Sequence, residues 1–195
     1  MKIAQEGYPF IAFFSFLSSL FLGLTAFMLF FFRDPERRIP NVPGAFLSPA
    51  DGKVIFIGEV EEDKYLKERR KKISVFMSPF DVHINRSPCD GIVVMVKHNT
   101  GKFLAAYREG ASLENENTEI IIESVQGSIL VRQVAGFLAR RTVCRVGVGD
   151  VLERGERFGM IKFSSRVDIY LPLECEVLVK LGQKVRAGES IIARI

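Results

Sequence analysis

The pattern of apolar and polar positions divides the chain into two parts. Residues 9–32 carry no charged side chain and are almost entirely apolar. Because about 20 consecutive apolar residues span the hydrocarbon core of a bilayer, this segment predicts a hydrophobic helical membrane anchor. From residue 39 onward, short runs of β-branched and aromatic residues are separated by glycine, proline and aspartate, which is typical of strands joined by turns.

The second part contains a series of segments with the length and composition of strands. These segments are 53–60, 72–77, 91–98, 119–124, 128–141, 166–171, 176–181 and 190–195. Alternation in the run 166–171 places Val167, Ile169 and Leu171 on one face of a strand. The charged run 59–72 is expected to be a solvated connection.

These patterns predict a mainly β fold, with a compact β-sandwich or barrel-like domain behind the N-terminal anchor. Glycine turns between valine- and isoleucine-rich strands, at 48–60 and 181–195, resemble the hairpins of lipoyl-type carrier domains. We place the anchor and its basic flank at 1–38 and the β domain at 39–195. Whether the anchor crosses the bilayer once or re-enters it is left open by the sequence.

The net charge of the chain indicates which classes of partner it could bind. The net charge of +4 suits an anionic partner, either a membrane surface or a nucleic acid. The soluble part lacks interleaved basic and aromatic residues, so no nucleic-acid partner is expected.

Arg33, Arg37 and Arg38 follow the anchor and place the β domain on the cytoplasmic side of the cell membrane. Three cysteines without a CxxC pair and two histidines predict neither a disulfide framework nor a metal site.

Several polar residues interrupt the strand pattern and are candidates for chemistry. Asp51 lies in an Asp-Gly turn, whose ordinary role is to bind nearby backbone donors. Asp81 and His83 share a face if the chain is extended, so this carboxylate is able to orient the imidazole. Ser165 directly follows Ser164. A serine becomes a nucleophile when a histidine held by a carboxylate removes its proton, and Asp51, His83 and Ser165 supply those three groups.

Five motifs together resemble one enzyme family. They are "SPADGKV", "MSPFDVHINRSP", "ENEN", "VRQVAGFLARR" and "ERFGMIKFSSRVDIYLP". In this order they are similar to the short prokaryotic form of phosphatidylserine decarboxylase, and archaetidylserine decarboxylases, which act on ether lipids, are similar at this level. The resemblance covers essentially the whole chain. It implies a membrane-bound lyase that converts phosphatidylserine, or a related aminophospholipid, to phosphatidylethanolamine.

The resemblance also implies a proenzyme that cuts its own backbone. The cut falls between Ser164 and Ser165 and yields a β chain, 1–164, and an α chain, 165–195, which form a heterodimer. Ser165 then becomes a covalent pyruvoyl group, the cofactor, which forms a Schiff base with the substrate amine. No metal is implied, and assembly into a larger homo-oligomer is left open.

The same resemblance gives roles to individual residues. Asp51, His83 and Ser165 correspond to the self-cleavage triad, with Asp81 sharing the orienting role. His83 is also expected to be the acid that protonates the decarboxylated intermediate. Some members have a second histidine three residues further along, where this chain has Arg86, so a division of labour between two histidines is in doubt here.

The remaining assignments concern the substrate and the cut. Arg86 and Asn115, the latter in "ENEN", are expected to bind the substrate, whereas His98 is expected to be an exposed strand end. The family's usual dipeptide at the cut is Gly-Ser. Because glycine accepts positive φ and close backbone approach, Ser164 is expected to slow or block maturation, although other pyruvoyl enzymes are cut between two serines.

A different class of function remains an alternative at this point. The chain also resembles a non-enzymatic, membrane-tethered β module of the lipoyl or sugar-phosphotransferase type. Such a module predicts no backbone scission. It also predicts no ketone that reacts with hydrazine-type reagents.

Overall fold

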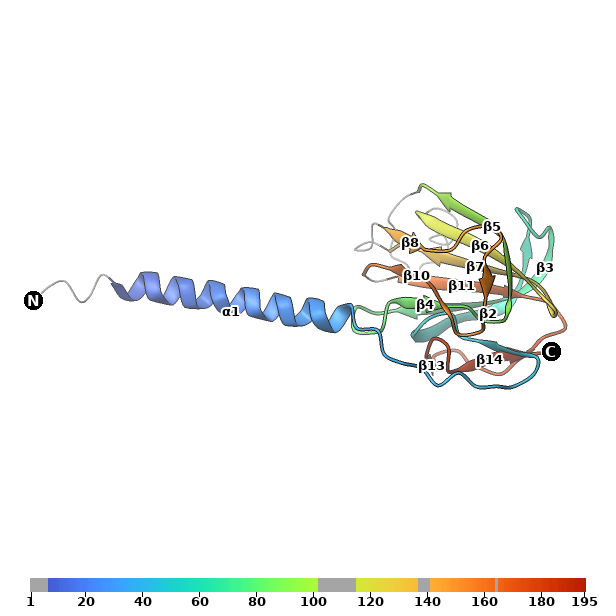
Figure 1. Cartoon of the computed structure of the whole chain (residues 1–195), viewed down its shortest axis with the longest axis horizontal. Helices are drawn as coiled ribbons and strands as arrows, with labels where there is room; N and C mark the ends of the chain where they lie inside the picture. The colour runs from blue at the N-terminus through green and yellow to red at the C-terminus, as the bar shows by residue number, and fades with distance from the viewer. Residues whose placement is uncertain (1–6, 102–114, 137–140, 164) are drawn as a thin grey trace, which may run out of the picture. The chain divides into compact units, whose positions relative to one another are not determined.

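A computed structural model describes residues 7–101, 115–136, 141–163 and 165–195 of the chain. The chain forms two compact units, 1–33 and 34–195. The described part of the first unit is a helix, α1 (Gly7–Phe31), drawn in blue in Figure 1. Its Phe10–Phe31 stretch has a mean hydropathy of 2.0 and is long and apolar enough to cross a membrane. The predicted N-terminal apolar helix is therefore confirmed, and it indicates association with a membrane.

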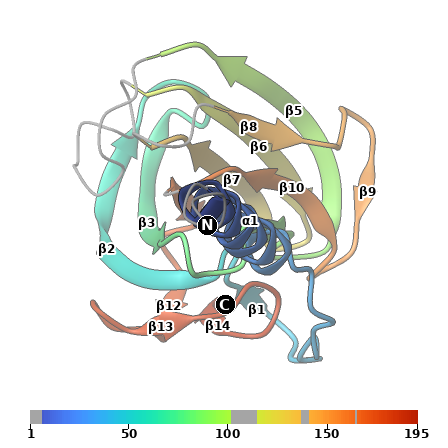
Figure 2. The same ribbon diagram turned by 90° about the vertical axis from the view of Figure 1, so that its left-hand side faces the viewer.

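The second unit consists of antiparallel strands, which form three sheets among the described residues (Figures 1 and 2). The largest sheet has the order β13-β2-β3-β11-β7-β6-β5-β9 and curls into a half-barrel. Its strands are β2 (Gly52–Glu62), β3 (Glu68–Met77), β5 (Gly91–Asn99), β6 (Asn117–Ser124), β7 (Gly127–Val134), β9 (Val151–Leu152), β11 (Ser165–Leu171) and β13 (Lys184–Val185). The mainly β prediction is confirmed.

Two small sheets complete the unit. One has the order β1-β14-β12 and the other the order β4-β10-β8. Their strands are β1 (Ala45–Leu47), β14 (Ile191–Arg194), β12 (Glu176–Val177), β4 (Ile84–Arg86), β10 (Arg157–Ile161) and β8 (Thr142–Cys144). Most of these strands are too short to produce a period-2 signal in the sequence, which is why the sequence pattern did not predict β1, β4, β8 and β10.

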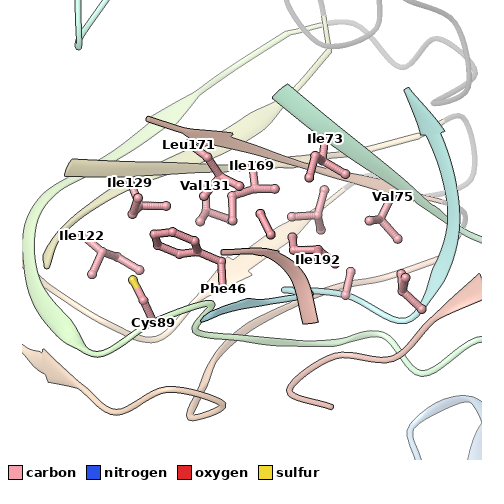
Figure 3. Close-up of a cluster of buried hydrophobic side chains, with 14 of the residues drawn as sticks. Phe46, Ile73, Val75, Cys89, Ile122, Ile129, Val131, Ile169, Leu171 and Ile192 are labelled. Carbon is pink, nitrogen blue, oxygen red and sulfur yellow. The ribbon is translucent and has the colours of Figure 1, made fainter. Parts of the chain in front are cut away.

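The core lies against the concave face of the large sheet (Figure 3). Val167, Ile169 and Leu171 of β11 are fully buried there, as their alternation predicts. Phe46 of β1 and Ile192 of β14 pack into the same cluster. Each aliphatic or aromatic side chain buried in this way contributes about 1.5–3 kcal/mol of hydrophobic free energy, so the cluster fixes which face of each strand points inward.

The charged run 59–72 is largely exposed, as its composition predicts, but most of it is paired strand and not a simple connection. It forms the two arms of the β2–β3 hairpin, and Glu62 and Arg70 are only 4% and 6% exposed. The Glu62 carboxylate accepts the backbone N–H groups of Tyr65 and Leu66 at 2.9 and 2.7 Å, which closes the turn. These charges are buried because each finds a partner in the folded chain, and charge composition does not show such partners.

An ion pair on the opposite face joins three neighbouring strands of the large sheet. Arg132 of β7 donates from Nε to Glu119 Oε1 of β6 at 2.6 Å and from Nη1 to Tyr170 Oη of β11 at 2.7 Å. All three side chains are at least nine-tenths buried. Burial alone raises the pKa of Glu119, but the nearby Arg132 charge and hydrogen bonds outweigh it, so the pKa of Glu119 is lowered. The carboxylate is therefore ionised and holds β6, β7 and β11 together.

Replacing Glu119 by glutamine is expected to lower the free energy of unfolding by about 3 kcal/mol, because the buried guanidinium of Arg132 loses the nearer of its two carboxylate partners, Glu119 and Glu62. Urea unfolding of the full chain in detergent, followed by circular dichroism, measures this. The matched control is Glu59→Gln, which breaks a surface pair with Arg69 whose side chains are 46% and 58% exposed. That control is expected to change stability by less than about 1 kcal/mol. Equal effects of the two substitutions would show that the buried pair is not a special source of stability.

Candidate active site

Ser165 is the first residue of β11, the strand between β3 and β7 in the large sheet. It pairs with Met77, the last residue of β3. Its side chain is on the same face as that of Val167, because residues two apart along a strand point the same way. The residue is fully buried, and its Oγ lies 3.4 Å from Met77 Sδ. The hydroxyl therefore lies in a site shielded from water, beside a weak acceptor.

His83 lies in the connection between β3 and β4 and is also fully buried. Its Nδ1 is 2.9 Å from the backbone oxygen of Asp81. A carbonyl oxygen only accepts, so Nδ1 carries a hydrogen and Nε2 is the ring nitrogen that is able to accept a proton. The orienting contact thus comes from the backbone of Asp81. The Asp81 carboxylate instead accepts from the N–H and Oγ of Ser78, at 2.8 and 2.7 Å.

The fold brings Ser165 and His83 to the same end of the domain. The strand β10 ends at Ile161, whose N–H donates to the backbone oxygen of His83 at 3.3 Å. Only three residues then separate Ile161 from Ser165. Within that turn Phe163 has a φ of 61°, in the left-handed region, which costs a residue with a side chain of the order of 1 kcal/mol or more. Ser164 lies outside the described residues.

Asp51 is held by partners other than the predicted ones. Its two carboxylate oxygens accept from Arg37 Nη2 at 2.9 and 2.8 Å, and Oδ1 also accepts the N–H of Ala187 at 2.8 Å. Burial raises the pKa of Asp51 more than these bonds lower it. Among the described residues, Asp51, His83 and Ser165 do not hydrogen-bond to one another. The Arg37 side chain is 6% exposed, so this cation of the basic flank is bound within the protein.

The two residues expected to bind substrate also hold backbone segments. Arg86 is 5% exposed; it donates to the Gly155 oxygen at 3.0 Å and pairs with Asp34 at 3.2 Å. Asn115 is fully buried and donates to the Ala135 oxygen at 2.7 Å. Both side chains therefore bind groups of the protein itself.

Sequence reasoning missed a pair of buried amides beside the serine. Gln133 Nε2 donates to Asn85 Oδ1 at 2.8 Å, and both side chains are at least 99% buried. Asn85 Nδ2 lies 3.8 Å from Met77 Sδ, the same sulfur that Ser165 Oγ contacts. The only signal in the sequence is that Gln133 occupies a core-facing position of the strand, in phase with Val131.

The thiols of the domain are poor candidates for a nucleophile. Burial raises the pKa of Cys89 to about 12 and that of Cys175 to about 11, so both are protonated at neutral pH. Burial also raises the pKa of Cys144. In the described parts of the chain, no group of three or more His, Cys, Asp or Glu side chains is placed to hold a metal ion.

The protein thus combines an apolar helix long enough to cross a membrane with a β domain in which a serine and a histidine are buried at the same end. The sequence profile described as phosphatidylserine decarboxylase matches residues 24–193. Phosphatidylserine decarboxylase proenzymes of Syntrophotalea carbinolica and Geotalea uraniireducens are 45% and 46% identical to the chain, over 97% of it and 95% of each relative. That of Desulfotalea psychrophila is 43% identical over 100% of the chain and 97% of the relative.

The chain therefore belongs to the phosphatidylserine decarboxylase family, as its motifs predict. Enzymes of this family are lyases of phospholipid biosynthesis, made as zymogens, and their pyruvoyl cofactor derives from a serine of their own chain. The predicted enzyme class and cofactor are thus confirmed. The alternative of a non-enzymatic β module is not supported.

Proposed function

We propose that the chain decarboxylates phosphatidylserine to phosphatidylethanolamine at the membrane, after cutting itself between Ser164 and Ser165. The observation that carries this proposal is the position of Ser165, fully buried at the start of a central strand. It follows a turn that contains the strained Phe163, and it lies at the end of the domain where His83 is buried. A hydroxyl in such a place is protected from water and is close to its own peptide bond.

The self-cleavage uses groups of the chain itself. Ser165 Oγ attacks the carbonyl carbon of Ser164, so that an ester bond forms as the peptide C–N bond breaks. His83 Nε2 accepts the hydroxyl proton and returns it to the departing nitrogen. Loss of the α-proton of Ser165 then expels the carboxylate of Ser164 and leaves a carbon–carbon double bond. Water next replaces the amine, which leaves as ammonia, and a carbonyl remains at residue 165.

The surroundings of Ser165 fit a pyruvoyl group. A carbonyl in a buried site needs a donor, and Asn85 Nδ2, fixed by Gln133, stands beside the same Met77 sulfur as Ser165 Oγ. The pyruvoyl group supplies an electron sink for the pair of electrons that the departing carbon dioxide leaves behind. His83 holds the proton that the substrate carbon then requires.

The proposal also includes where the enzyme acts and what it becomes. The helix α1 keeps the domain at the bilayer in which the lipid substrate is concentrated, and Arg33, Arg37 and Arg38 favour the cytoplasmic side. After the cut, 1–164 and 165–195 remain a heterodimer, because β11 is paired on both sides with strands of the larger fragment. Each end of the smaller fragment is thus held by main-chain hydrogen bonds.

A Ser164→Gly variant tests the proposal. Because glycine adopts a strained turn without a Cβ penalty, we expect this chain to cut itself at least as fast as the natural one. Intact mass spectrometry should show fragments 1–164 and 165–195. The smaller fragment should react with a hydrazine reagent, and the cut protein should release carbon dioxide from phosphatidylserine vesicles.

The matched control is Ser128→Gly, in the β6–β7 hairpin, which should cut at the natural rate. A Ser164→Gly chain that stays whole and releases no carbon dioxide from the vesicles would overturn the proposed function. Fragments of other lengths would move the cut to another residue.

A further inference from the structure

A cavity of about 340 Å³ lies beside β5, β6 and β8. Its polar lining consists of His98, Glu116, Thr118, Arg141 and Thr142. None of these residues has a role in the self-cleavage described above. We therefore ask whether this cavity binds a ligand.

The cavity opens on the face of the large sheet that also carries Ser165. His98 of β5 pairs with Thr118 of β6, Thr118 with Gln133 of β7, and Gln133 with Val167 of β11. Residues paired across antiparallel strands point to the same face, and Val167 shares its face with Ser165. Since neighbouring strands are about 4.8 Å apart, Thr118 is roughly 10 Å across the sheet from Val167.

The walls of the cavity are held by their own polar contacts. His98 Nδ1 lies 3.0 Å from Thr118 Oγ1, which lies 2.6 Å from Thr142 Oγ1. These contacts join β8 of a small sheet to the large sheet. His98 Nε2 faces Glu116 Oε1 at 3.8 Å. His98 is exposed and next to the last residue of β5, as expected, and it is also part of the polar wall of this cavity.

Arg141 is a cation with no side-chain partner among the residues that the structure describes. Its residue is exposed, and its guanidinium makes no hydrogen bond or ion pair within the described parts of the chain. Its backbone oxygen accepts the N–H of Lys162 at 3.4 Å, which places it beside the turn that leads to Ser165. A guanidinium that lines a cavity is suited to a planar or tetrahedral oxyanion.

We propose that this cavity binds the phosphodiester of the serine headgroup and that Arg141 pairs with it. The proposal rests on the proposed function. Two carbons and an oxygen separate the amine from the phosphorus, so the phosphate must lie a short way along the sheet from residue 165. The Glu116 carboxylate repels an anion on its side of the cavity, which leaves the Arg141 side for the phosphate.

The substrate has a second anionic group, its carboxylate. The reaction changes the charge of the carboxylate but not that of the phosphodiester, and this difference indicates which group a cation should bind. The carboxylate loses its charge as it becomes carbon dioxide, so a cation paired with it would stabilise the ground state more than the transition state. The phosphodiester keeps its charge throughout the reaction. Arg141 therefore contributes uniform binding, which lowers KM and leaves kcat nearly unchanged.

An Arg141→Gln variant tests the assignment. We expect KM for phosphatidylserine vesicles to rise about tenfold, as for the loss of one charged hydrogen-bonded pair, with kcat within about twofold of the natural value. Inhibition by glycerophosphoethanolamine should weaken by about the same factor, and inhibition by ethanolamine, which has no phosphate, should not change. The matched control is Arg145→Gln, an exposed arginine outside the cavity, which should behave as the natural chain.

A binding measurement separates this proposal from the proposed function. Uncut chains that carry Ser165→Ala, with and without Arg141→Gln, are titrated with glycerophosphoserine in detergent and followed by ligand-observed NMR. We expect about tenfold weaker binding when Arg141 is replaced. Equal binding by the two chains, binding by neither, or an unchanged KM in an active enzyme would overturn the assignment. Failure of the natural chain to release carbon dioxide would overturn the proposed function instead.

Discussion

Replacing Ser165 by alanine will leave the chain as one piece of 195 residues and reduce carbon dioxide release from phosphatidylserine vesicles to the background rate. The reason is that this one residue has two roles in the proposed chemistry. Its Oγ is the nucleophile that opens the peptide bond, and its Cα becomes the carbonyl carbon of the pyruvoyl group. Intact mass, hydrazine labelling and carbon dioxide release measure the three consequences on one sample.

The matched control for this variant is Ser74→Ala. Ser74 is another buried serine, 1% exposed, on the neighbouring strand β3, so its replacement tests the general loss of a buried hydroxyl. We expect this control to cut itself and to decarboxylate at the natural rate. A Ser165→Ala protein that still produced two fragments, or still released carbon dioxide, would remove the basis of the proposed mechanism.

The second large effect is expected for His83→Gln, which should slow self-cleavage by a factor of about 10²–10⁴, the usual contribution of a general base. Glutamine is able to keep a donor toward the Asp81 oxygen, but it has no basic nitrogen in place of Nε2. The rate is measured by following the loss of the intact mass after synthesis in a cell-free system with detergent.

The other histidine provides the control. Self-cleavage needs no lipid substrate, so His98→Gln should cut at the natural rate although His98 lines the proposed phosphate cavity. Added imidazole should restore part of the rate to a His83→Ala chain, which leaves room for it. If His83→Gln cuts as fast as the natural chain, another group acts as the base.

Some parts of the fold were predictable because one local pattern determines them. The apolar run before Arg33 determines α1, and alternation in the segment that begins at Arg166 determines β11 and the face that joins the hydrophobic core, although the opposite face of β11 is buried as well. The charged hairpin was predicted only in part because Glu62 and Arg70 are buried by partners that only the folded chain supplies. The composition of a segment gives its charge, whereas the burial of each charged side chain depends on the groups that the folded chain places next to it.

For the site, the sequence motifs predicted the family and the candidate residues, but not the contacts between them. The family was recognised from its motifs, and the structure adds what they do not state. Asp51 meets Arg37 through a segment that wraps back onto the domain. The contact between Asn85 and Gln133, and that between His98 and Thr118, depend on the register of paired strands. Such contacts join positions far apart in the sequence, so no local pattern reveals them.

The central position of β11 has a consequence for timing. Ser165 is buried between β3 and β7 only when β11 has taken its place in the sheet. Under the proposed mechanism, maturation therefore follows folding, and a chain with a misplaced strand keeps an ordinary serine and stays inactive. Only correctly folded molecules then acquire the reactive ketone.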